Sequence, residues 1–380
     1  MTSVRPLAFV FLQMVSGLLA AETPQPLLAP GDGLAEWKAK REGLRARWVQ
    51  ALGVAPSPKY HTPEYGVRQK YFQAERVETF VTPEFQGVLW RQRTGEDTWQ
   101  RVLIMTPLHL QGRTAGVVVP FYDPDRMCGY DLRTKAKLGP ERNTAFFGLH
   151  LVQQGYVVAA VEAYPFNLLS PSAQAASKGG MGVWRDAAAK LAKQHPQWTG
   201  MGKLTNDTLY AADLFVGETQ VDPERLAIMG HSLGGKMAFY AGCLDRRFKA
   251  IVASDFGIAW DATNWGDAWY FGEGRLRAMR DEGLSHEQLL ACAAPTCFFL
   301  IAGQYDSRAA SGPYLAEALK VHRLYNREEP VEMFDHHTGH QPSWDALKSA
   351  YLWLARKMDM PRPDFAYLDR LAREQAQAGK

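Results

Sequence analysis

Five short apolar runs stand out along the chain between residues 115 and 303. They read AGVVVPFY, YVVAAVEAY, RLAIMG, KAIVASD and PTCFFLIAG, and helical segments such as FFGLHLVQQ and DTLYAADLFVGET lie between several of them. Strands that are buried on both faces are apolar almost throughout, and they alternate with helices when a parallel sheet is covered on both sides. The pattern therefore predicts an α/β fold with a mostly parallel central sheet flanked by helices.

The chain on either side of this region has other periodicities. Residues 34–52 carry apolar residues at helical spacing, which predicts an amphipathic helix on the outside of the fold. Residues 70–107 alternate β-rich runs with turn residues, which favours antiparallel strands, and WDALKSAYLWLARKM predicts a last packing helix. We expect an N-terminal helical extension at 22–69, one catalytic domain at 70–358 and a solvated helical tail at 359–380.

The first residues have the pattern of a secretory signal peptide. Arg5 precedes an apolar stretch from Leu7 to Ala21, which is short for a membrane span and ends in small residues before Glu22. We therefore predict a signal peptide at residues 1–21, a secreted or periplasmic protein, and no stable membrane insertion after cleavage. A retained N-terminal anchor is the alternative.

Charge and cysteine content narrow the class of protein. The 43 basic and 40 acidic residues leave a formal charge of +3, which gives no electrostatic footprint for nucleic acid or anionic lipid. The four cysteines, Cys128, Cys243, Cys292 and Cys297, do not have zinc-ribbon spacing. Cys292 and Cys297 are the nearest pair for a bridge, yet Cys297 opens an apolar run, so buried thiols are favoured.

The stretch IMGHSLGGKMAF, residues 228–239, places Ser232 between Gly230 and Gly234 where a predicted strand gives way to a predicted helix. This is the context in which a G-x-S-x-G sequence marks a nucleophile elbow, because glycines let the backbone fold back around a strained serine and expose its hydroxyl. A turn serine that caps the helix is the alternative, but capping does not require glycine on both sides.

A serine nucleophile needs a base, and the base needs an orienting acid. In a strand-elbow-helix fold the chain order is Ser, then Asp or Glu, then His. His340 is the expected base because it lies in the loop DHHTGHQPSWDALK between the last predicted strand and the last helix, shaped by Gly339 and Pro342. His336 and His337 lie closer to the strand end. The cluster lacks H-E-x-x-H spacing, so we expect no metal.

Three carboxylates compete for the role of the acid. Asp306 follows the buried run FFLIAG by a short loop and is the expected acid. Asp255, which ends KAIVASD one strand earlier, is the rival, and Asp335 is a poorer choice because it still belongs to a strand.

Two backbone N–H groups are expected to stabilise an oxyanion. The first is that of Leu233, at the positive end of the helix after Ser232. The second is expected after the run AGVVVPFY, and we assign it to Tyr122, although this loop lacks the His-Gly pair of many lipases. His231 is interpreted as a packing residue rather than a base.

The order of these motifs resembles the α/β-hydrolase superfamily. VDPERLAIMGHSLGGKMAFYAGCLDRRFKAIVASD, FFLIAGQYD and GHQPSWDALKSAYLWL carry the resemblance over about residues 100–358. The chain looks most like the secreted dienelactone-hydrolase-like and acetyl xylan esterase-like branch. The resemblance implies a Ser232, Asp306 and His340 triad and hydrolysis through an acyl-enzyme, without metal or organic cofactor.

The aromatic stretch FGIAWDATNWGDAWYFGEG follows Asp255 and predicts a substrate-binding wall of Trp260, Trp265 and Trp269, although part of it is expected to be core. Residues 163–203 form a second insertion that is a candidate lid. With the predicted export, these features favour a secreted esterase acting on a carbohydrate ester of the acetyl xylan type. The alternatives are a dienelactone-type hydrolase of small esters, a serine peptidase on the same fold, and a non-catalytic carbohydrate-binding protein.

Overall fold

The computed structural model describes residues 24–53, 73–94, 98–168 and 182–378. The predicted signal peptide, residues 1–21, lies outside this part of the chain, as do residues 169–181 of the candidate lid. Among the helices that are described, none is both long enough and apolar enough to cross a membrane.

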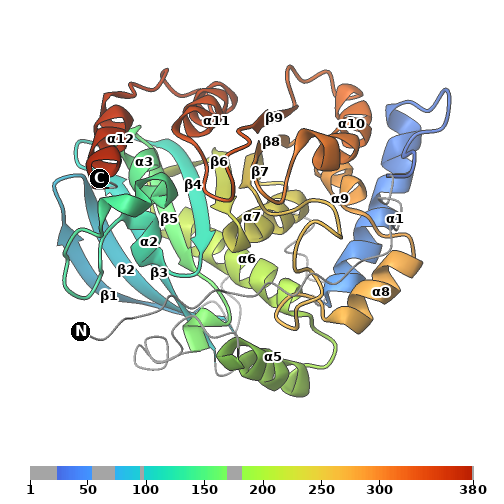
Figure 1. Cartoon of the computed structure of the whole chain (residues 1–380), viewed down its shortest axis with the longest axis horizontal. Coiled ribbons are helices and arrows are strands. Elements are labelled where there is room, and N and C mark those ends of the chain that lie inside the picture. Colours follow the sequence, from blue (N-terminus) through green and yellow to red (C-terminus); the bar gives the residue numbers. More distant parts are fainter. Residues whose placement is uncertain (1–23, 54–72, 95–97, 169–181, 379–380) are drawn as a thin grey trace, which may run out of the picture.

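A nine-stranded sheet runs through the molecule in the order β1-β2-β3-β5-β4-β6-β7-β8-β9 (Figure 1). The strands are β1 Ala74–Val81, β2 Phe85–Arg93, β3 Trp99–Pro107, β4 Thr114–Phe121, β5 Val157–Glu162, β6 Val221–His231, β7 Phe248–Ser254, β8 Cys297–Ala302 and β9 Val331–Asp335. Strands β1, β2, β3 and β5 pair antiparallel, and β5, β4, β6, β7, β8 and β9 pair parallel. The expected sheet is confirmed in both parts.

Helices cover both faces of this sheet (Figure 1). They are α1 Leu34–Leu52, α2 Pro124–Cys128, α3 Phe147–Gln153, α5 Gly182–Gln194, α6 Gly200–Glu218, α7 Leu233–Leu244, α8 Glu273–Asp281, α9 His286–Ala293, α10 Arg308–Arg323, α11 Trp344–Lys357 and α12 Ala366–Ala378, with short 3-10 helices η2 Pro140–Ala145 and η3 Phe166–Leu168. Each face has its own core, because successive side chains of a strand point to opposite sides.

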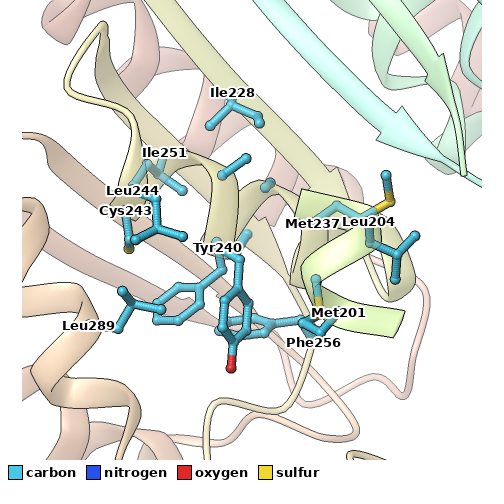
Figure 2. Packing of buried hydrophobic residues seen from close by; sticks show 14 of the residues in the cluster. Met201, Leu204, Ile228, Met237, Tyr240, Cys243, Leu244, Ile251, Phe256 and Leu289 are labelled. Carbon is cyan, nitrogen blue, oxygen red and sulfur yellow. The ribbon is translucent and has the colours of Figure 1, made fainter. Parts of the chain in front are cut away.

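Strand β6 shows this division between the two cores. Leu226 and Ile228 enter the cluster that α7 covers, whereas Ala227 and Met229 enter the opposite cluster. Figure 2 shows Ile228 among the buried side chains of the first cluster, which include Tyr240 of α7. The end of β6, where Ser232 follows, is therefore fixed by packing on both faces.

Two terminal helices are more deeply packed than the sequence pattern indicated. In α1, Trp37 and Trp48 are fully buried, and Trp48 stacks on Trp260 with ring centroids 6.1 Å apart. In α12, Leu368 and Leu371 are each only 2% exposed. Their apolar faces cover core side chains, so α1 belongs to the hydrophobic core and α12 is not a freely solvated tail.

All four cysteines are buried free thiols, as favoured by the sequence. Cys292 and Cys297 form no bridge with each other in the structure.

Buried histidines predict a loss of stability in acid. Burial lowers the pKa of His150, His231 and His286 to about 3 and that of His322 to about 4. Unfolded histidine has a pKa near 6.5, so as pH falls the unfolded chain binds these protons first and the folded state loses stability from about pH 6.5 downward. Each is expected to cost about 1 kcal/mol of unfolding free energy between pH 7.5 and 5.5. Urea unfolding at the two pH values measures this, and equal free energies would contradict it.

Candidate active site

Ser232 occupies a sharp bend between β6 and α7. Its φ of 55° and ψ of −117° lie in a region that residues with a side chain rarely adopt, and its N–H donates to the carbonyl of Ser254 at 2.8 Å. Its side chain makes no capping hydrogen bond to the helix, so the helix-cap interpretation does not hold.

The glycines of the motif are required by close backbone approach. A Cβ at Gly230 would lie 2.0 Å from the carbonyl oxygen of Gly234, and one at Gly234 would lie 2.0 Å from that of Pro120. The bend is therefore closed against both its own helix and the end of β4. Only residues without a side chain fit at these two positions.

His340 contacts Ser232 directly. Its Nε2 lies 2.9 Å from Ser232 Oγ, and the loop between β9 and α11 delivers it from the far end of the chain. The neighbouring histidines have other partners. The His337 side chain is 77% exposed and pairs with Asp335, and His336 Nδ1 pairs with Thr338 Oγ1 at 2.6 Å. The structure thus brings together Ser232 and His340 as the sequence predicted.

The carboxylate that holds His340 is Asp255, not Asp306. Asp255 follows β7, is fully buried, and its Oδ2 lies 2.5 Å from His340 Nδ1. Its Oδ1 accepts the backbone N–H groups of Tyr305 and Asp306 at 2.7 and 3.0 Å. Burial raises the pKa of Asp255, but the hydrogen bonds from His340 and from the two N–H groups outweigh it and lower the pKa below its usual value.

The expectation for Asp306 is wrong for a geometric reason. Its carboxylate is fully buried and accepts the N–H groups of Gly257 and Ile258 at 2.7 and 2.9 Å, together with the Ser311 hydroxyl at 2.7 Å. Burial is the largest influence and raises its pKa. Asp306 therefore ties the loop after β7 to α10, while Asp255, one strand nearer to Ser232, reaches the imidazole.

The two expected oxyanion donors follow the neighbouring strands β6 and β4. Leu233 is the first residue of α7, and the first N–H groups of a helix have no acceptor within it. Tyr122 follows β4, which pairs with β6 in parallel. An ion-pair network that was not predicted from the sequence holds the segment just after Tyr122, since Arg101 binds Asp125 and Glu162 at 2.9 Å each.

The three tryptophans of the predicted binding wall are buried. Trp260, Trp265 and Trp269 are 2%, 0% and 1% exposed. Two of their indole N–H groups are consumed by backbone carbonyls: Trp260 donates to Leu284 and Trp265 to Gly257. The prediction of an exposed aromatic wall is therefore wrong. Trp260 and Trp265 pack against His286 of α9, and Trp269 packs edge-on against Trp184 of α5.

The structure agrees with the interpretation of His231 as a packing residue, and it places a buried lysine, Lys236, which the sequence did not single out, in the helix after Ser232. The His231 ring lies 4.6 Å from that of His340 and pairs with Ser254 Oγ at 3.0 Å, and burial lowers its pKa so that it stays neutral beside the base. Lys236 is buried one turn after Ser232, donates to the carbonyl of Phe256 at 3.0 Å and lies over the Trp265 ring. Burial lowers its pKa to about 7.

Comparison with known proteins identifies the fold. The model of the prolyl oligopeptidase family matches residues 191–360. No curated protein matches the sequence. A glucuronoyl esterase from Solibacter usitatus is similar in structure with a TM-score of 0.66 and 16% identity, over 89% of this chain and 98% of that one.

Two further solved structures are similar to this chain. A CE15 glucuronoyl esterase from Teredinibacter turnerae gives a TM-score of 0.60 and 18% identity over 90% of this chain and 93% of that one. A candidate acetyl xylan esterase from Bacteroides fragilis gives 0.60 and 14% over 83% of this chain and 79% of that one. The chain has the α/β-hydrolase fold, as the resemblance implied.

Proposed function

We propose that the chain is a serine hydrolase that cleaves carboxylic esters on carbohydrates through an acyl-enzyme. The observation that carries this proposal is one line of contacts: Asp255 to His340 Nδ1 at 2.5 Å, and His340 Nε2 to Ser232 Oγ at 2.9 Å. A buried carboxylate that fixes an imidazole against a strained, partly exposed serine is the arrangement that activates a hydroxyl near neutral pH.

The chemistry follows from this geometry. His340 Nε2 takes the Ser232 proton while Oγ attacks the ester carbon, and the developing oxyanion is stabilised by the N–H of Leu233, with Tyr122 as the second donor. His340 then gives the proton to the departing alcohol and leaves an acyl-Ser232. Water, deprotonated by His340, releases the acid and restores the serine. Asp255 orients the ring and stabilises its positive charge throughout.

The carbohydrate substrate rests on similarity in fold. The neighbouring structures include glucuronoyl esterases and a candidate acetyl xylan esterase, which by name act on esters borne by or attached to sugars. Acetylated sugars and sugar-acid esters are thus the two substrate types. Export through the predicted signal peptide at residues 1–21 belongs to the same proposal.

A serine peptidase is the second candidate function. It is favoured by the match of residues 191–360 to the prolyl oligopeptidase family. The two functions differ in the leaving group, since an amide nitrogen must be protonated before it departs, whereas an ester alcohol leaves more readily.

A substrate panel tests the proposal. The purified chain is given 4-nitrophenyl acetate, acetylated xylan, methyl glucuronate and a peptide library, with the Ser232→Ala protein as the blank. We expect turnover of at least one carbohydrate ester and a blank peptide library. Cleavage of peptides without cleavage of any ester would replace the esterase by the peptidase.

A further inference from the structure

Three aromatic side chains from separate segments meet past the ends of β4 and β5, on one flank of the strand that leads to Ser232. Tyr122 follows β4, Phe166 begins η3 and Trp184 lies in α5, and all three are partly exposed. The ring centroids of Tyr122 lie 5.0 Å from those of Phe166 and 5.4 Å from those of Trp184, and the latter two are 5.3 Å apart. We call these three residues the ring cluster.

A guanidinium borders the ring cluster. The Arg126 guanidinium carbon is 5.5 Å from the Tyr122 centroid and 5.8 Å from that of Phe166, within the range of a cation–π contact. Arg126 is also paired with Asp123 at 3.3 Å, and its side chain is 34% exposed. It therefore offers N–H donors at the edge of the rings without adding an unpaired charge.

The sheet order places the ring cluster on a defined side of Ser232. Strand β6 has β4 and then β5 on one flank, and Tyr122 and Phe166 follow these two strands. On its other flank lie β7, β8 and β9, which lead to Asp255, Tyr305 and His340. The base and the ring cluster thus flank the nucleophile from opposite sides.

This placement indicates where the alcohol and the acyl group of a bound ester lie relative to Ser232. The alcohol oxygen must lie toward His340 Nε2, because that nitrogen protonates it as it leaves. The carbonyl oxygen must face the N–H of Leu233. The substituent on the acyl carbon is then left to the flank of β4 and β5, where the ring cluster is.

On the basis of the proposed function, we propose that Tyr122, Phe166 and Trp184 form an acyl subsite that selects esters whose acyl group carries a six-membered ring. Flat, half-buried rings stack on the apolar face of such a ring, and Arg126 donates hydrogen bonds to substituents on its rim. An acetyl group is too small to cover this surface. The buried tryptophans 260, 265 and 269 have no surface with which to do the same.

The Trp184→Ala variant tests this assignment. Its kcat/KM is measured on methyl glucuronate and methyl benzoate, which have the ring in the acyl group, and on 4-nitrophenyl acetate, which has it in the alcohol. We expect the ratio of kcat/KM for the ring-acyl esters to that for the acetate to fall about 10-fold, mainly through KM. If this ratio falls for methyl glucuronate and not for methyl benzoate, the acyl group that the subsite selects carries a hydroxylated ring. If it falls for methyl benzoate and not for methyl glucuronate, the ring is aromatic.

Phe80→Ala is the matched control. Phe80 is a partly exposed ring with Lys135 4.5 Å from its centroid, but it lies on β1 at the far end of the sheet order from β6. We expect the ratio of kcat/KM for the ring-acyl esters to that for the acetate to be the same in Phe80→Ala as in the unaltered chain. If Trp184→Ala does not fold, Phe166→Leu is measured in its place.

The outcomes separate this inference from the proposed function. Equal losses on all three esters, or a loss confined to the acetate, would overturn the acyl subsite while leaving the esterase in place. Absence of turnover of every ester by the unaltered chain would instead overturn the proposed function, and with it the acyl subsite.

Discussion

Ser232→Ala and His340→Ala are each expected to lower kcat for ester hydrolysis by about 10⁶-fold. The reason is that His340 Nε2 and Ser232 Oγ lie 2.9 Å apart and act as one unit, so either change alone removes the activated nucleophile. The double variant should therefore be no slower than either single variant. Initial rates on 4-nitrophenyl acetate, with the three proteins purified side by side, measure the effect.

His337→Ala is the control for the loop. His337 lies three residues from His340, but its side chain is 77% exposed and faces Asp335. We expect kcat to stay within about 2-fold of the unaltered chain, since the surface substitution removes no contact with Ser232. A large loss of kcat in His337→Ala with a small loss in His340→Ala would identify His337 as the base.

Asp255→Asn is expected to lower kcat by about 10⁴-fold with little change in fold. Asparagine keeps the shape, but its amide group cannot stabilise the positive imidazole and favours the wrong tautomer of His340. The 2.5 Å contact between Asp255 and His340 Nδ1 is the interaction that is lost. Rates measured across pH 6 to 9 test this prediction, because the carboxylate is missing from the variant at every pH in this range.

Asp306→Asn is the matched comparison, since both carboxylates are fully buried and accept backbone N–H groups. Asp306 makes no hydrogen bond with His340, so its change is expected to act on stability, by about 1–3 kcal/mol, because one buried N–H loses its charged acceptor. Urea unfolding and kcat are measured on both variants. A greater loss of kcat in Asp306→Asn would restore Asp306 as the acid.

The nucleophile and the base could be read from the sequence because their signals are local. Ser232 sits where an apolar run ends between two glycines, and the structure shows that the glycines are enforced by carbonyl oxygens 2.0 Å from a would-be Cβ. His340 stands in a short loop between a strand and the last helix. The parallel sheet was equally accessible, since β4, β5 and β8 are apolar almost throughout and buried on both faces.

The acid could not be read in this way. Asp255 and Asp306 both follow buried strands and both precede His340, so chain order does not separate them. Which of the two carboxylates reaches His340 depends on which one accepts hydrogen bonds from the backbone N–H groups of Gly257 and Ile258. These groups donate to Asp306. Such contacts join residues about 50 positions apart in the chain.

The prediction of a tryptophan binding wall was wrong for a related reason. Tryptophans next to polar and glycine residues have the composition of a binding loop, but contacts from distant segments bury them. Trp48 of α1 stacks on Trp260, and Trp184 of α5 packs edge-on against Trp269. The ring cluster was not visible in the sequence because Tyr122, Phe166 and Trp184 come from three segments. Their rings come into contact only in the folded chain.

Mass spectrometry of the chain after reaction with a fluorophosphonate tests whether His340 activates Ser232 as the nucleophile, because this reagent phosphonylates a serine only when a neighbouring base activates it. We expect one adduct, on the peptide that contains Ser232, and none in His340→Ala. An unreacted Ser232 in the folded chain, or an adduct that forms equally in His340→Ala, would contradict it.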